Sequence, residues 1–202
     1  MSSVDSDTDH ALRVFREYAS SLVLAIQEAS EREFAQALAA IVAALRAGRQ
    51  IWIAGNGGSA TTAMHIASDL TAHAPAGAKQ PIAMPANVGA LTAVANDFAY
   101  EDVFAQPLRR FANSGDLLIV LSVSGSSPNV VRAAAVARSR NMEVIALTGV
   151  DGGIGEHSSI NVVLGAGDFG VSEDLHLSFG HAAVRLLRSG APNLVGDAIC
   201  ES

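Results

Sequence analysis

Residues 50–73 read QIWIAGNGGSATTAMHIASDLTAH. The apolar run at 51–54 is long enough for a buried strand, and the glycine-rich turn after it lets the backbone bend sharply and approach a ligand closely. Helix-favouring residues begin at Ala60, so the free N–H groups of a helix start would point back over the turn and attract anions. The stretch therefore predicts a strand, a tight turn and a helix, in that order.

Three interpretations of this turn compete. The first is a plain strand-to-helix connection without a ligand. The second is a dinucleotide site, because Gly55, Gly57 and Ala60 match G-x-G-x-x-G/A, but that site also needs an acidic residue after the next strand. The next apolar run, at 81–84, is followed by Pro-Ala-Asn and no acid. The third is a phosphosugar site, which needs hydroxyl and amide donors from another loop.

A second loop of the required kind follows the apolar run DLLIVLSV at 116–123. Ser122, Ser124 and Ser127 supply hydroxyl groups there. Ser127 suits a helix N-cap and Pro128 suits the first helical position. In a parallel sheet both loops lie at the carboxyl edge, where ligands bind. Together the two loops favour a phosphorylated ligand.

The rest of the pattern predicts an α/β fold. Two helices are expected at 8–29 and 30–48, the second opened by a capping box of Ser30 and Glu33, and these form an N-terminal helical hairpin. Further helices are expected at 60–73, after Asn87, at 101–112 with Pro107 kinking or dividing it, at 128–140 and at 172–190. Strands are expected at 51–54, 81–84, 116–123, 143–147 and 160–164. Alternating strands and helices indicate a doubly wound, flavodoxin-like parallel sheet of about five strands.

We expect one domain over residues 1–202, with helices at 1–48 used in oligomerisation, an α/β core at 49–190 and a tail at 191–202. The net charge of −7 and the isolated Lys79 argue against nucleic-acid binding. No apolar run approaches the ~20 residues of a membrane span. The start has no basic region typical of a secretory signal. Cys200 is the only cysteine, so no internal disulfide forms and a reducing, cytoplasmic location is expected.

Two pairs of titratable residues stand out. His65 and Asp69 are four apart and share one helix face, and Glu173 and His181 lie on neighbouring faces of the last helix. Either pair alone is more often structural than functional. His176, amid apolar residues, is expected to be a satisfied core histidine.

Four segments together resemble the SIS (sugar isomerase) domain: GNGGSATTAMHIASDLTAH, AVANDFAYEDVF, SVSGSSPNVVRAAAVAR and ALTGVDGG. They look most like the phosphoheptose isomerases, which interconvert sedoheptulose 7-phosphate and a D-glycero-manno-heptose 7-phosphate. The resemblance implies an acid–base pair of Asp69 and His181, and a zinc site of His65, Asp69, Glu173 and His181. It implies substrate contacts from Asn56, Gly57, Gly58, Ser59, Asn96, Asp97, Ser122, Val123, Ser124, Ser127 and Glu173. It also implies a homotetramer in which helices 60–73 and 172–190 face each other across a subunit boundary.

The chain departs from the family pattern near the implied site. The family has Glu at Asp69, Gln at Glu173, Thr at Val123 and a basic residue at His73, and a longer polar stretch around 169–172. The leading expectation is an aldose–ketose isomerase that works through an enediol. The alternatives are a non-catalytic SIS scaffold that binds a replication initiator or another partner, and a phosphosugar-binding regulator. His65, Asp69 and His181 favour the enzyme.

Overall fold

The computed structural model describes residues 3–189, so the tail expected at 191–202 and its Cys200 lie outside the described residues. Its centre is a five-stranded sheet in the order β2-β1-β3-β4-β5, with every neighbouring pair parallel. The strands are β1 (Ile51–Gly55), β2 (Ile82–Ala83), β3 (Leu117–Ser122), β4 (Glu143–Thr148) and β5 (Ile160–Val163). This order is that of flavodoxin-like sheets, so the predicted fold class is confirmed.

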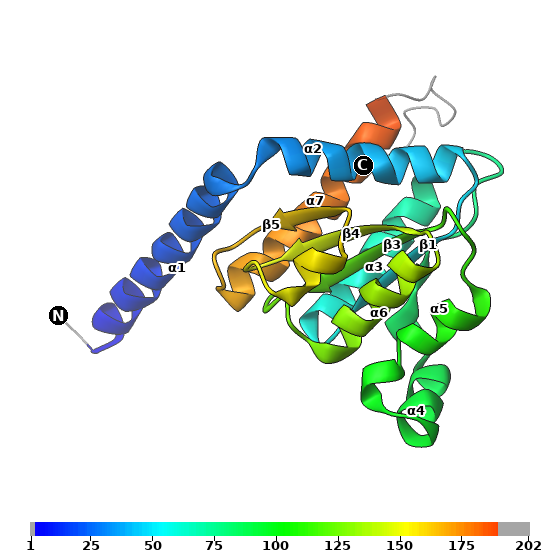
Figure 1. Ribbon diagram of the computed structural model, residues 1–202. Coiled ribbons are helices and arrows are strands. Elements are labelled where there is room, and N and C mark those ends of the chain that lie inside the picture. Colours follow the sequence, from blue (N-terminus) through cyan, green and yellow to red (C-terminus); the bar gives the residue numbers. More distant parts are fainter. Residues whose placement is uncertain (1–2, 190–202) are drawn as a thin grey trace.

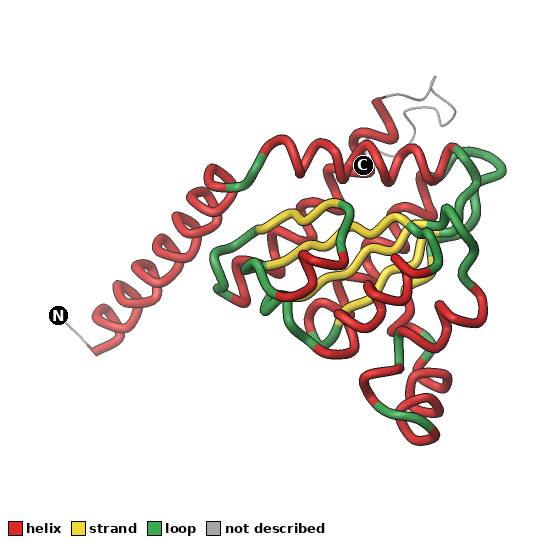
Figure 2. Tube along the Cα trace, viewed as in Figure 1, coloured by secondary structure: helices red, strands yellow, loops and turns green. Residues whose placement is uncertain are grey.

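Helices cover both faces of the sheet (Figures 1 and 2). The α-helices are α1 (Ser3–Glu28), α2 (Glu31–Arg46), α3 (Gly58–His73), α4 (Val88–Asp97), α5 (Ala105–Phe111), α6 (Pro128–Ser139) and α7 (Phe169–Ser189), with 3-10 turns η1 (Met84–Ala86), η2 (Tyr100–Asp102) and η3 (Gly153–His157). α2, α3 and α7 pack on one face, and α5 and α6 on the other. Within residues 3–189, none of these helices combines the length and apolarity that a bilayer crossing requires.

Alternation along the strands builds two cores. Ile51 and Ile53 of β1 pack with α2, α3 and α7, whereas Trp52 and Ala54 pack with α5 and α6. Successive strand residues point to opposite faces, so a strand covered on both faces must be apolar throughout. This is why β1 and β3 appear in the sequence as unbroken hydrophobic runs.

The strand order also positions the two loops. β1 and β3 are neighbours, with Gly55 opposite Leu121, while β2 lies on the other side of β1. The connections that leave β1 and β3 therefore diverge. The crevice between them at the carboxyl edge is where sheets of this kind bind ligands. The glycine turn after β1 (residues 55–59) and the serine loop after β3 (residues 122–127) both lie at this edge.

The predicted helical hairpin is wrong. α1 and α2 meet at Ala29 and Ser30 and then diverge, and α1 projects away from the body of the molecule (Figure 1). The capping box is also wrong, since Ser30 makes no side-chain cap hydrogen bond. α1 is held instead by α7, because the Tyr18 hydroxyl donates to the Asp174 carboxylate at 2.7 Å. That hydrogen bond raises the pKa of Tyr18 to about 12, so the phenol remains a donor.

Several element boundaries differ from expectation. The helix predicted at 101–112 is η2 followed by α5, and the break lies at Val103 and Phe104, which are buried. Pro107 sits in the first turn of α5, where its missing N–H leaves no helical bond unmade. The strand expected at 81–84 has only two residues, and α1, α3 and α7 begin two to five residues earlier than their sequence patterns indicate.

Candidate functional site

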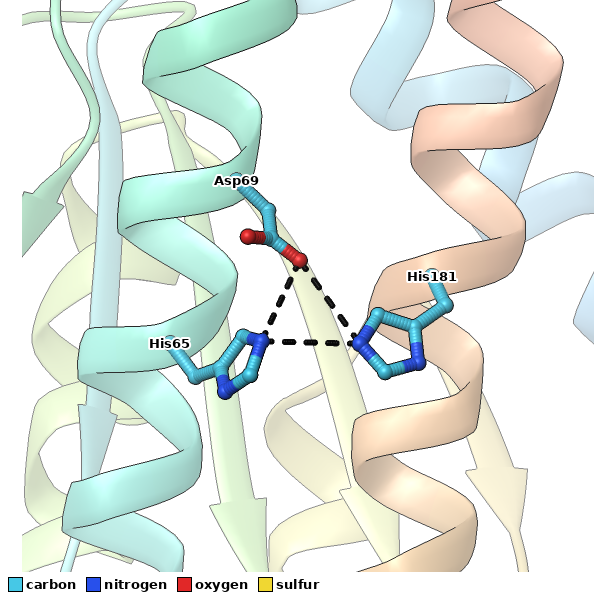
Figure 3. Close-up of side chains that lie close together, drawn as sticks. All are labelled: His65, Asp69 and His181. Carbon is cyan, nitrogen blue, oxygen red and sulfur yellow. Dashed lines mark hydrogen bonds and ion pairs between the residues drawn. The ribbon is translucent and has the colours of Figure 1, made fainter. Parts of the chain in front are cut away.

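Three titratable side chains meet where α3 and α7 pack side by side (Figure 3). His65 Nε2 lies 3.4 Å from Asp69 Oδ2, and His181 Nε2 lies 3.7 Å from the same oxygen. The two Nε2 atoms are 3.5 Å apart. α3 supplies His65 and Asp69 through their i, i+4 spacing, as predicted, and α7 supplies His181. All three come from one chain, which corrects the expectation that these helices face each other across a subunit boundary.

The triangle suits a small divalent cation. Tetrahedral zinc with ligands at about 2.0–2.1 Å places the ligand atoms about 3.3–3.4 Å apart, close to the three distances observed. Two imidazole nitrogens and one carboxylate oxygen are also the ligand types that zinc prefers. The side chains of His65, Asp69 and His181 are 48%, 30% and 50% exposed, so the triangle is open to solvent and substrate.

Within the described residues, Glu173 does not join this cluster, so the structure brings together three of the four implied ligands. Its carboxylate lies against Gly58 at the start of α3, in the space that a Cβ there would need. Eight residues separate Glu173 from His181, a rise of about 12 Å along α7, and the Glu173 carboxylate is directed toward Gly58 rather than toward the three clustered side chains.

The serine loop is braced internally. The hydroxyls of Ser122 and Ser127 are 3.5 Å apart, and Ser124 Oγ accepts the N–H of Ser126 at 3.3 Å. Ser127 makes no side-chain cap to α6, contrary to expectation, whereas Pro128 takes the first helical position as predicted. The Ser127 hydroxyl therefore stays available beside the N-terminus of α6.

Val123 contributes differently from its serine neighbours. Its side chain is buried against Gly149, and its carbonyl accepts the N–H groups of Gly149 and Val150 at 3.0 and 3.1 Å. Val123 therefore fixes the loop to the exit of β4 and offers no side-chain donor to a ligand.

The glycine turn carries Asn56, with Gly57 at a φ of +54° that glycine adopts without strain. The Asn56 amide bonds Asn129 and Tyr100, two residues that the sequence patterns did not single out. Ser59 is buried beside Gly55. A hydrogen bond across two loops has no local sequence signal, which explains why Asn129 and Tyr100 were missed.

The remaining predicted substrate residues, Asn96 and Asp97, are exposed at the end of α4. Asn96 Nδ2 donates to Asp97 Oδ1 at 2.9 Å. The structure does not bring them into the triangle, and within residues 6–189 this bond is the only one that either side chain makes. Their segment reaches the glycine turn through Tyr100.

His176 is buried in the core, as predicted, but it is not a satisfied histidine. Neither ring nitrogen has a hydrogen-bond partner within the described residues, and neither does the hydroxyl of Ser172 one turn earlier. Burial lowers the pKa of His176 to about 4, and the nearby backbone of Thr148 opposes this shift without meeting hydrogen-bond geometry. The imidazole is therefore neutral at physiological pH.

Comparison with known proteins identifies the family. Residues 14–149 match the SIS domain model. The chain is 41% identical to a phosphoheptose isomerase of Mycobacterium bovis over 148 residues, covering 70% of this chain and 74% of that protein. It is 38% identical to that of Chlorobaculum parvum over 160 residues, covering 76% and 77%.

A solved structure agrees with these relatives. The phosphoheptose isomerase GmhA from Neisseria gonorrhoeae superposes with a TM-score of 0.81 at 29% identity, over 90% of this chain and 98% of that one. The likeness thus extends beyond the matched domain model to nearly the whole described chain. The protein belongs to the SIS domain family and, within it, to the phosphoheptose isomerases.

Proposed function

We propose that the protein interconverts the ketose sedoheptulose 7-phosphate and its aldose isomer through an enediol. The cluster of His65, Asp69 and His181 carries this proposal, together with the serine loop at the carboxyl edge of the sheet. Isomerisation moves a proton between neighbouring carbons, which needs a base at the carbon and an acid at the oxygens. Asp69 is suited to take the carbon-bound proton and His181 to exchange protons with the substrate oxygens.

The position of the triangle accords with a long substrate. Gly58, in the glycine turn, and His65 are seven residues apart on α3, a rise of about 10 Å. A phosphate held by Ser122, Ser124, Ser127 and the N-terminus of α6 would leave the far end of an extended seven-carbon sugar near the acid–base groups. Asn56, Gly57, Gly58 and Ser59, with Asn96, Asp97 and Glu173, are proposed to line the path between.

Zinc is part of the proposal. His65, Asp69 and His181 would hold it through Nε2, Oδ2 and Nε2, and the ion would supply Lewis-acid stabilisation of neighbouring substrate oxygens. The remaining oxygen of Asp69 would stay free to accept a proton, and Nδ1 of His181 would remain for proton exchange with the substrate.

The decisive experiment combines turnover of sedoheptulose 7-phosphate with metal analysis. Asp69→Asn keeps the shape of the side chain but removes the base, so turnover should fall by roughly 10²–10⁴-fold. His181→Ala should lose turnover and bound zinc together. His157→Ala, at η3 and outside the triangle, serves as the matched histidine control and should retain both. A wild-type protein without turnover or proton exchange would overturn the proposal in favour of the scaffold alternative.

We also propose a homotetramer built through α1. Leu12, Phe15, Val23 and Ile26 are exposed on this projecting helix, next to the edge on which Tyr18, Leu22 and Ala25 contact the chain's own body. Part of the apolar surface of α1 thus packs within the chain, and the adjoining part is available to a second copy. A cytoplasmic location belongs to the same proposal, and the single cysteine of the sequence accords with it.

A further inference from the structure

The side-chain amides of Asn56 and Asn129 form a reciprocal pair. Asn56 Nδ2 donates to Asn129 Oδ1 at 2.9 Å, and Asn129 Nδ2 donates to Asn56 Oδ1 at 2.8 Å. Asn129 is only 2% exposed, and a buried amide needs such partners. Because Asn56 follows β1 and Asn129 follows β3, the pair joins the two loops that open at the carboxyl edge.

A third hydrogen bond holds the Asn56 amide in place. The Tyr100 hydroxyl donates to Asn56 Oδ1 at 3.1 Å, so this oxygen accepts from two donors, the capacity of an amide oxygen. The amide nitrogen has two hydrogens, and one of them goes to Asn129. The second N–H of Asn56 makes no hydrogen bond within the described chain and is the one group that the side chain can offer a ligand.

Tyr100 is itself held firmly, although its ring is half exposed. It opens η2, and Asp102 in the same turn accepts from Arg109 at 2.8 Å and from Arg132 at 2.9 Å. These two arginines belong to α5 and α6. The hydrogen bond from Arg109 holds the pKa of Asp102 below its usual value, so the carboxylate that anchors η2 stays ionised.

We propose that Asn129 and Tyr100 are positioning residues that hold the Asn56 amide with its free N–H toward an acceptor oxygen of the sugar phosphate. The inference rests on the proposed function, since it assigns a substrate contact to Asn56. Neither residue touches the substrate. Tyr100 also couples the segment formed by the end of α4, which carries Asn96 and Asp97, and η2 to the glycine turn. The two loops and this segment therefore share one hydrogen-bond chain.

The first test is kinetic. Tyr100→Phe removes one hydrogen bond to Asn56 Oδ1 without changing the ring, and KM for sedoheptulose 7-phosphate should rise roughly three- to tenfold at unchanged kcat, the size of one neutral hydrogen bond. Asn129→Asp keeps the acceptor for Asn56 Nδ2 but sets a carboxylate oxygen against Asn56 Oδ1, and the rise should be larger. Thr92→Val, whose hydroxyl bonds only its own helix α4, should leave KM unchanged.

A double-mutant cycle separates positioning from a general structural effect. In an Asn56→Ala background, Tyr100→Phe and Asn129→Asp should change KM no further, because the amide they orient is gone. Equal increases in KM in both backgrounds would show that the two residues act by another route and would overturn the proposal. Tyr100→Phe leaves the buried pair intact, so the cycle remains informative even if Asn129→Asp fails to fold.

A spectroscopic readout distinguishes failure of this inference from failure of the proposed function. The side-chain NH₂ signal of Asn56, assigned by its loss in Asn56→Ala, should shift in Tyr100→Phe and not in Thr92→Val. A shift in a protein without isomerase turnover would support the hydrogen-bond chain and reject the isomerase. An unshifted signal in an active enzyme would reject the hydrogen-bond chain alone.

Discussion

His176 is a buried imidazole that the fold keeps neutral. Its folded-state pKa of about 4 lies below the ordinary value of about 6.5, so the unfolded chain binds the proton more readily. Stability from this group is complete above about pH 6.5 and is lost as the pH falls toward 4. We expect the free energy of unfolding to fall by roughly 3 kcal/mol across that window. Denaturant titrations from pH 4 to 8 would measure it.

The matched variant for this prediction is His176→Leu, which removes the titrating group and leaves a side chain suited to the surrounding core. The informative quantity is how steeply its free energy of unfolding changes with pH, rather than its stability at any one pH. The variant should lose little stability between pH 6.5 and 4 beyond what carboxylate protonation costs both proteins. Parallel wild-type and variant curves in that window would contradict the assignment.

Ser124 gives a second prediction at this scale, concerning phosphate recognition. Its exposed side chain lies in the serine loop, with Oγ close to the N–H of Ser126. Ser124→Ala should weaken sugar-phosphate binding by about 1.5–3 kcal/mol, the value of one hydrogen bond to a charged group. Calorimetry measures this, with Ser139→Ala as control, because the Ser139 hydroxyl bonds only the Val136 carbonyl of its own helix. Unchanged affinity in Ser124→Ala would exclude this hydroxyl from the phosphate site.

At the scale of elements, the contact between α3 and α7 decides whether the triangle exists. A Cβ at Gly180 would lie 2.6 Å from Ile66 Cγ1, so Gly180→Ala must push the helices apart. We expect a loss of about 1–3 kcal/mol in stability from overpacking, together with weaker zinc binding as His181 moves from Asp69. Gly89→Ala on α4, where the new Cβ would meet only Asn87 Oδ1 at an ordinary contact distance of 3.8 Å, should be neutral or slightly stabilising. Thermal unfolding and zinc titration would test both variants, and a Gly180→Ala protein with unchanged zinc affinity would contradict this role for the contact.

Local patterns identify the elements but not how they come together. The apolar runs of β1 and β3 and the i, i+4 pair of His65 and Asp69 follow from spacing alone, and the structure confirms them. The sequence resemblance indicates His181 and Glu173 together, but it does not predict that the Glu173 carboxylate lies against Gly58, away from the other three side chains. The predicted helical hairpin is wrong because a serine between two helices is compatible with both an antiparallel and a divergent arrangement. The hydrogen bond from Tyr18 to Asp174, which holds α1 against α7, joins residues far apart in the sequence and leaves no local signal.

For the whole molecule, the projecting α1 predicts self-association. Phe15 is 69% exposed on this helix, and Phe15→Asp should shift the species from tetramer toward smaller forms by placing a charge in the proposed interface. Phe111→Asp, at a phenylalanine that is 67% exposed on α5, is the control and should keep the wild-type mass. Light scattering at micromolar concentration reads out both. A monomeric wild-type protein would refute the assembly.

The pairing of α3 with α7 also has a consequence for biosynthesis. His181 follows His65 by 116 residues, and all five strands lie before α7 in the chain. Chains emerge from the ribosome N-terminus first and domains tend to fold as units, so the nascent chain has its entire sheet before it has α7. Until translation reaches that helix, one face of the sheet is covered only in part, by α2 and α3, and His65 and Asp69 lack their partner. The proposed zinc site is therefore complete only after α7 has been synthesised and has packed against α3.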